Sequence, residues 1–256
     1  MESNDRVVSR FVYRANGCGA GCYFTRVLED TTLRPLPTRS SVSLPVTGGR
    51  AHCCYDGDAL SAGKRDLFMT GPVVTRAETR SNEKDGTTQT WVTAEASDVW
   101  VHGGLEIPYV KAHLEASSSP KDEVGPIRVG KCVLNEVRLG DRVVKVELDI
   151  DTFHRCDTMD EIQREVRERP KDFIVSDKGV IVASTVRKLT LVGEPDPRIR
   201  IEGHTIHWDD FGWIILGEIL ISKQYRRLTM VRLEMGSQVG GKLGIGETET
   251  DGHTLP

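Results

Sequence analysis

The sequence predicts an all-β protein, an antiparallel sandwich or barrel-like stack of sheets with one short edge helix. Three successive segments, 68–80, 88–102 and 105–115, alternate apolar and polar residues and are separated by turn-forming residues. Side chains of a strand point alternately to opposite faces of its sheet, so this alternation places one face of each segment in a core. Hairpin signals recur along the chain, whereas a complete helix signal occurs once.

The first strands are expected near the N-terminus, over about 6–14 and over 22–28. The intervening segment 15–21 contains three glycines. It predicts a turn, because glycine adopts the positive φ angles that other residues resist. The segment 29–39 holds two prolines and predicts an irregular connection, after which strand character resumes over 41–46.

Later strands are joined by short turns. Asp85-Gly86 and Gly140-Asp141 each separate two alternating segments. Turns of this composition are typical of β-hairpins, since their backbone twist matches that of the flanking strands. The remaining strands are expected over 127–139, 142–150, 172–175, 180–192, 198–207, 213–222, 226–235 and 242–250.

One helix is expected, over 158–169. Thr158 and Glu161 form a T-x-x-E capping box, in which each side chain satisfies a backbone N–H at the helix start, and Pro170 ends the helix. Its apolar residues form only a narrow stripe, so we expect the helix to lie at the edge of a sheet.

The chain is expected to form a single β-rich domain over 1–256. The segment 116–126 is rich in Ser, Pro and charge, and it is the best candidate for a linker between two lobes, 1–116 and 127–256. All-β domains commonly reach about 200–250 residues. The sequence therefore leaves both divisions open.

Composition argues against two classes of partner. The chain has 34 basic and 38 acidic residues, a net charge of −4, and no clustered basic face of the kind that nucleic acid requires. No apolar run approaches the roughly 20 residues that cross a bilayer. The polar segment 1–6 lacks the features of a signal peptide. We expect a cytoplasmic protein, a mature form, or one exported without a cleaved signal.

The cysteines offer one candidate metal site. Cys18, Cys22, His52 and Cys54, with Cys53 beside them, supply the thiolate and imidazole ligands that zinc prefers. The spacing is not the common C-x2-C knuckle, and adjacent cysteines in a strand would face opposite ways. Free buried thiols are the favoured alternative and a local disulfide is another. Zinc is the one cofactor considered, and none is expected.

A candidate ligand site lies in the segment 204–210 and just beyond it. His207 and Asp209 share a face if the strand continues that far, and they could form an acid/base couple or a loop hydrogen bond. Trp208 and Trp213 flank the loop, where exposed tryptophans would provide a carbohydrate platform. Core packing of both rings is the structural alternative. No nucleophile elbow or metalloprotease motif is present, so no catalytic residue is predicted.

Several strings resemble one known family. The sequence "VSLPVTGG" at 42–49 is followed by "VHGGLEIPYVKAHLEAS" at 101–117 and "CVLNEVRLGDRVVKVELD" at 132–149, with "FGWIILGEILIS…RRLTMVRLEM" near the end. The order and spacing of these strand segments resemble those of the choice-of-anchor P family of β-rich bacterial proteins. The resemblance implies an extracytoplasmic protein with no established activity. This chain departs from that pattern in its cysteines and in lacking a signal segment.

We expect a non-enzymatic structural or interaction protein, which assembles with itself or with another protein through strand edges or sheet faces. Long strands with Thr, Ala and Ser faces favour this function, because unpaired edges are templates for assembly. Two alternatives remain: a small-ligand or carbohydrate-binding domain using Trp208, Trp213, His207 and Asp209, and a metal-binding protein using Cys18, Cys22, His52 and Cys54.

Overall fold

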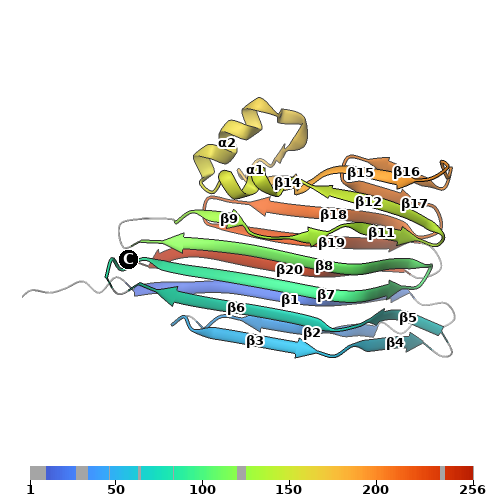
Figure 1. The fold of residues 1–256 in the computed structure, drawn as a ribbon, viewed down its shortest axis with the longest axis horizontal. Helices are drawn as coiled ribbons and strands as arrows, with labels where there is room; N and C mark the ends of the chain where they lie inside the picture. The colour runs from blue at the N-terminus through green and yellow to red at the C-terminus, as the bar shows by residue number, and fades with distance from the viewer. Residues whose placement is uncertain are drawn as a thin grey trace, which may run out of the picture.

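The chain forms two stacked antiparallel sheets of nine and eleven strands (Figure 1). The all-β sandwich predicted from the alternating segments is therefore confirmed. The computed structural model describes residues 10–26, 34–45, 47–62, 65–82, 84–119, 125–236 and 240–255.

The nine-stranded sheet has the order β13-β14-β18-β19-β20-β1-β2, and β16 and β17 extend it beside β18. Its strands are β1 (Arg10–Arg26), β2 (Arg34–Ser43), β13 (Ile174–Val175), β14 (Ile181–Ser184), β16 (Ile199–Glu202), β17 (Thr205–Trp208), β18 (Gly212–Ile221), β19 (Tyr225–Gly236) and β20 (Gly240–Leu255).

The eleven-stranded sheet has the order β15-β12-β11-β8-β7-β5-β4, with β3, β6, β9 and β10 attached to this path. Its strands are β3 (Arg50–Tyr55), β4 (Asp58–Ala62), β5 (Arg65–Thr70), β6 (Val73–Ser81), β7 (Thr88–Val101), β8 (Leu105–Ser118), β9 (Ile127–Val129), β10 (Val133–Leu134), β11 (Glu136–Leu139), β12 (Arg142–Leu148) and β15 (Val186–Val192).

Small residues let the two sheets approach closely. In β7, the inward-facing Val92, Ala94 and Ala96 are almost fully buried and alternate with partly exposed neighbours. Alternation of this kind indicates that one face of the strand packs on the other sheet while the second face meets solvent. The prediction from segment 88–102 is confirmed by this pattern.

The glycine-rich segment 15–21 lies inside β1, so the predicted turn between two strands is wrong. A Cβ added to Gly17 would lie 2.4 Å from Thr75 Cγ2, and one added to Gly19 would lie 2.0 Å from Val73 Cγ1. Both neighbours belong to β6 of the facing sheet. Glycine is needed here because the opposing sheet leaves no room for a side chain, not because the chain reverses.

The helical part contains two helices, where the sequence predicted one. The capping box of α2 (Met159–Glu168) is present as predicted, with Thr158 accepting from the Glu161 N–H. Before it comes the six-residue α1 (Ile150–Arg155), which is too short to show a helical period. A single 3-10 turn, η1 (Pro170–Asp172), follows α2.

Strands from both 1–116 and 127–256 contribute to both sheets. β1 pairs with β20 along most of its length, and β8 pairs with β9 on the far side of the segment 120–124. The two ranges therefore share one core. Neither helix has the length and apolar composition needed to span a membrane, within the part of the chain that the structure describes.

Both long sides of the sandwich are tied by hydrogen bonds. On one side, the chain crosses from one sheet to the other between β14 and β15, at Thr185. The Thr185 N–H and hydroxyl both donate to the Gly217 carbonyl. On the other side the Ser40 hydroxyl donates to the Cys53 carbonyl at 2.7 Å.

Candidate functional site

The hairpin of β17 and β18 carries the predicted tryptophans on either side of its turn and places them on opposite faces. Trp208 faces inward, is 9% exposed, and stacks on Phe211 with ring centroids 5.3 Å apart. Trp213 pairs across the strands with His207 and is 43% exposed. The two tryptophans therefore do not form one platform. Trp208 belongs to the core, and Trp213 belongs to the outer face of the nine-stranded sheet.

A pocket of about 260 Å³ opens at this end of the sandwich. The stacked rings of Trp208 and Phe211 form its apolar part, and charged side chains surround them. Among the described residues, no hydrogen bond or ion pair reaches the Asp210 carboxylate. We call this site the end pocket; it is lined by His102, Gly103, Arg198, Trp208, Asp209, Asp210, Phe211 and Met235.

Beside the end pocket, the predicted contact between His207 and Asp209 is present. His207 Nδ1 lies 3.3 Å from Asp209 Oδ1, and Arg200 NH2 lies 2.6 Å from the same nitrogen. Arginine has no acceptor, so Nδ1 accepts this hydrogen bond and carries no proton. His207 cannot then pass a proton from Nδ1 to Asp209, and the geometry favours a fixed polar cluster over an acid/base couple.

The His207 ring also holds Trp213 in place. The two rings meet edge to face, with centroids 4.5 Å apart and an interplanar angle of 66°. Edge-to-face contacts of this geometry are favourable for aromatic rings. We call Arg200, His207, Asp209 and Trp213 the outer cluster.

Arg198 is anchored at the rim of the end pocket. Its backbone N–H and its guanidinium donate to Asp196, whose carboxylate is nearly buried. These hydrogen bonds, with the charges of Arg198 and Arg142, lower the pKa of Asp196 to about 2. A carboxylate that stays ionised holds Arg198 in one orientation at the pocket.

Sequence reasoning found Trp208, Asp209 and, within the segment 204–210, Asp210, but it missed the other five lining residues. His102 comes from the turn between β7 and β8, Arg198 precedes β16, and Met235 lies near the end of β19. Only Phe211 had a local signal, because it lies between the two tryptophans in the same turn. The other four, His102, Gly103, Arg198 and Met235, are brought there by packing of segments far apart in the chain.

The structure does not bring the four predicted metal ligands together. Cys18 and Cys22 lie on β1 of one sheet, whereas His52 and Cys54 lie on β3 of the other. Burial and the charge of Glu247 raise the pKa of Cys18 to about 12, which opposes the thiolate that a metal needs. No group of three metal-ligating side chains occurs among the described residues, and the six cysteines form no disulfide with one another.

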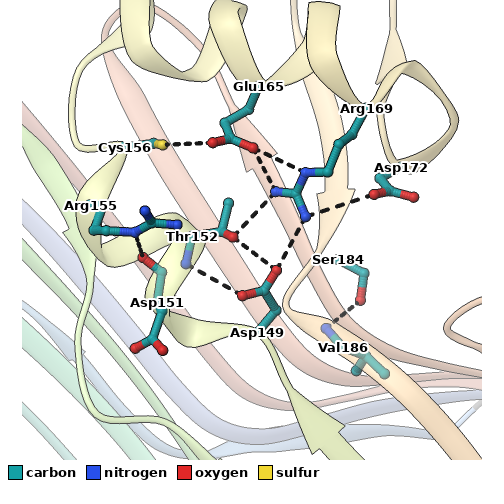
Figure 2. Close-up of polar contacts among 10 residues, drawn as sticks. All are labelled: Asp149, Asp151, Thr152, Arg155, Cys156, Glu165, Arg169, Asp172, Ser184 and Val186. Atoms are coloured by element: carbon teal, nitrogen blue, oxygen red, sulfur yellow. Dashed lines mark hydrogen bonds and ion pairs between the residues drawn. The ribbon is translucent and has the colours of Figure 1, made fainter.

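A second hollow, of about 460 Å³, lies beside the helices. Figure 2 shows Arg169 reaching from the end of α2 into a set of acceptors. Its guanidinium lies 2.8 Å from Glu165 Oε2, 3.4 Å from Asp149 Oδ2 and 3.2 Å from the Thr152 hydroxyl. We call this site the helix hollow; it is lined by Asp149, Asp151, Thr152, His154, Arg155, Glu165, Arg169 and Arg187.

The contacts of Arg169 tie the two helices to the strand before them. Asp149 follows β12 and caps α1 by accepting from the Thr152 N–H and hydroxyl. Arg169 contacts this same carboxylate from the end of α2, so one arginine joins the start of one helix to the end of the next. The central groups of the helix hollow satisfy one another, which indicates a structural role.

Comparison with known proteins gives one match. The family model described as "Domain of unknown function (DUF8256)" matches residues 11–176, more than half of the chain. No curated protein and no solved structure matches. The match covers β1 to β13 and ends before the residues of the outer cluster.

Proposed function

We propose that this chain, which belongs to the DUF8256 family, is a binding protein that holds a small saccharide in the end pocket. One observation carries the proposal: an aromatic stack is surrounded by charged donors and acceptors in a pocket at a strand-turn end. Ligand sites combine apolar and aromatic walls with a few well-placed polar groups, and this pocket has both.

The pocket is suited in size to a single ring. Its volume of about 260 Å³ lies just below the roughly 300 Å³ at which pockets for drug-sized ligands begin. The apolar face of a sugar ring would lie against the parts of the Trp208 and Phe211 rings that reach the pocket, since the two residues are 9% and 5% exposed. Its hydroxyl groups would donate to the Asp209 and Asp210 carboxylates and accept from Arg198.

The charges around the pocket also favour a neutral ligand. Asp209 and Asp210 oppose an anion, while Arg198 would oppose a cation. A neutral polyol can donate to the acids and accept from the bases at once. This distinguishes a saccharide from phosphate-bearing ligands, for which a single sign of charge would be expected.

Titration calorimetry and tryptophan fluorescence with methyl glycosides of glucose, galactose, mannose and N-acetylglucosamine test the proposal. We expect at least one glycoside to bind, and we expect Asp210→Asn to weaken that binding about tenfold, since hydrogen bonds to charged groups contribute roughly 1.5–3 kcal/mol. Asp177→Asn is the matched control, because Asp177 is an exposed aspartate in the turn between β13 and β14, away from the end pocket. If no glycoside binds up to its solubility limit, the proposal is wrong.

Assembly through strand edges is the second candidate, and one edge supports it. Among the described residues, β15 pairs only with β12, so its other edge is open for seven residues. Exposed Arg187 and Lys188 lie on this strand, however, and charges on an edge oppose the addition of another strand. Light scattering over a wide concentration range tests it: a mass that rises with concentration, and that Thr190→Lys reduces, would favour assembly.

A further inference from the structure

We infer that the ligand is an oligosaccharide, whose terminal ring enters the end pocket and whose next ring lies on Trp213. The inference rests on the proposed function and extends it from one ring to a chain. It assigns a role to the outer cluster, which a single-ring ligand in the pocket would not contact.

The two sites share one residue. Asp209 lines the end pocket, and its Oδ1 lies 3.3 Å from His207 Nδ1 and 3.4 Å from Arg200 NH2 in the outer cluster. Phe211 in the pocket and Trp213 on the outer face are separated only by Gly212, which has no side chain. A ligand leaving the pocket over this turn therefore meets Trp213 next.

Trp213 has the properties of a fixed stacking surface. It is 43% exposed, and the edge-to-face contact with His207 holds its ring in one orientation. Arg200 in turn holds His207 by its 2.6 Å contact with Nδ1. A ring that is already ordered loses less conformational entropy when a ligand binds on it.

Polar side chains lie beside Trp213 in a row across the strands. The registers pair Arg200 with His207, His207 with Trp213, Trp213 with Glu234, and Glu234 with Lys242. Their side chains are therefore neighbours on one face of the sheet. Hydroxyl groups of a second sugar ring would find donors and acceptors on both sides of the indole.

The rim of the combined site is nearly balanced in charge. It has three acids, Asp209, Asp210 and Glu234, and four bases, Arg198, Arg200, Arg232 and Lys242, of which Arg232 and Lys242 both pair with Glu234. A polyanion such as nucleic acid would meet three carboxylates along the same path. The balance favours an uncharged chain.

Chain-length dependence of affinity tests the inference. The probes are one-, two- and three-ring members of the cellulose, maltose and chitin series, titrated by calorimetry. We expect the second ring to raise affinity about three- to tenfold, the gain from one aromatic contact, and the third ring to add little. Trp213→Ala should remove the gain and leave single-ring affinity unchanged.

Tyr109→Ala is the control, because Tyr109 is 38% exposed on the other sheet and should leave the whole series unchanged. Equal affinity for one and two rings would overturn the inference while the proposed function stands. A gain that persists in Trp213→Ala would overturn it too. If no member of any series binds, the inference and the proposed function both fail.

Discussion

The helix hollow and the end pocket lie beyond opposite ends of β12, and both are lined by arginines and carboxylates. In the helix hollow, Arg169 contacts Asp149 and Glu165 directly. In the end pocket, the arginine at the rim is held by Asp196, which is not a lining residue, and the Asp210 carboxylate takes no hydrogen bond from a described residue.

The difference between the two hollows separates a structural ion network from a binding site. Charges that satisfy one another hold two helices together and have little left for a ligand. In the end pocket, Arg198 is anchored by Asp196, and the Asp210 carboxylate takes no hydrogen bond from a described residue, so that carboxylate is available to a ligand. The size of a hollow is therefore a poorer guide to function than the partners of its polar groups, since the helix hollow is the larger of the two.

The largest effect is expected at the floor of the end pocket. Trp208→Ala should lower the free energy of unfolding by about 3 kcal/mol, because a nearly buried ring stacked on Phe211 is replaced by a cavity. Urea unfolding measures this change. Trp213→Ala should cost about 0.5 kcal/mol or less as an exposed substitution. Equal losses in the two variants would contradict the division into an inner and an outer tryptophan.

Removing the guanidinium of the helix hollow should have a smaller effect. Arg169→Met should lower the free energy of unfolding by about 1–2 kcal/mol, because two carboxylates lose their partner in a site that is partly shielded from water. Arg138→Met, which breaks a more exposed pair with Glu136, is the control and should cost about 0.5 kcal/mol or less. If both substitutions cost the same in urea unfolding, the helix hollow is not a structural network.

Loss of the α2 cap should act locally. Thr158→Ala removes the acceptor for the Glu161 N–H, a change that costs about 1 kcal/mol in helices. We expect faster hydrogen exchange in α2 and unchanged exchange around the end pocket. Thr87→Ala, in an exposed turn where the hydroxyl donates to Asp85, should leave α2 unchanged. Faster exchange at both ends of the protein would show that the helices and the pocket unfold together.

The smallest effect is expected from acid at His204, in the turn between β16 and β17. Burial lowers the pKa of His204, next to β17, with Glu218 and Arg232 acting in opposite directions. As the pH falls through about 6.5, His204 takes up a proton in the unfolded chain before it does so in the folded one. The stability contributed by the neutral, buried side chain is therefore fully present above that pH and is lost below it. The unfolding free energy of the native chain should therefore fall more than that of His204→Gln between about pH 7 and about pH 5. Equal falls would assign the effect to other groups such as His113, whose pKa is also lowered by burial.

Local signals in the sequence predicted the features that depend on neighbouring residues. The turn at Gly140-Asp141 joins β11 to β12 as expected, and Thr158 and Glu161 cap α2. The prediction for the glycines of β1 was wrong because glycine is needed there for the close approach of the facing sheet. The contacting residues of that sheet lie about 60 residues away in sequence. A strand that needs glycine for close approach and a turn that needs it for positive φ have the same local sequence.

The candidate site was partly predictable for the same reason. His207 and Asp209 make the contact that was expected if the strand continued, but β17 ends at Trp208 and Asp209 lies in the turn that follows it. The orientation of Trp208 and Trp213 depended on where the turn fell, and it placed them on opposite faces. Arg198 reaches the pocket because Asp196 holds it, and no spacing in the sequence predicts this placement.

The pairing of β1 with β20 has a consequence for biosynthesis. β1 lies between β2 and β20, and its partner on one side is made only after some 200 further residues have been translated. Until then, one edge of a 17-residue strand stays open while the strands of the other sheet are already available. Pairings this distant in sequence form slowly. The nascent chain therefore depends on its last strand to close the central part of the nine-stranded sheet, and chains released before residue 240 would expose a long edge to aggregation.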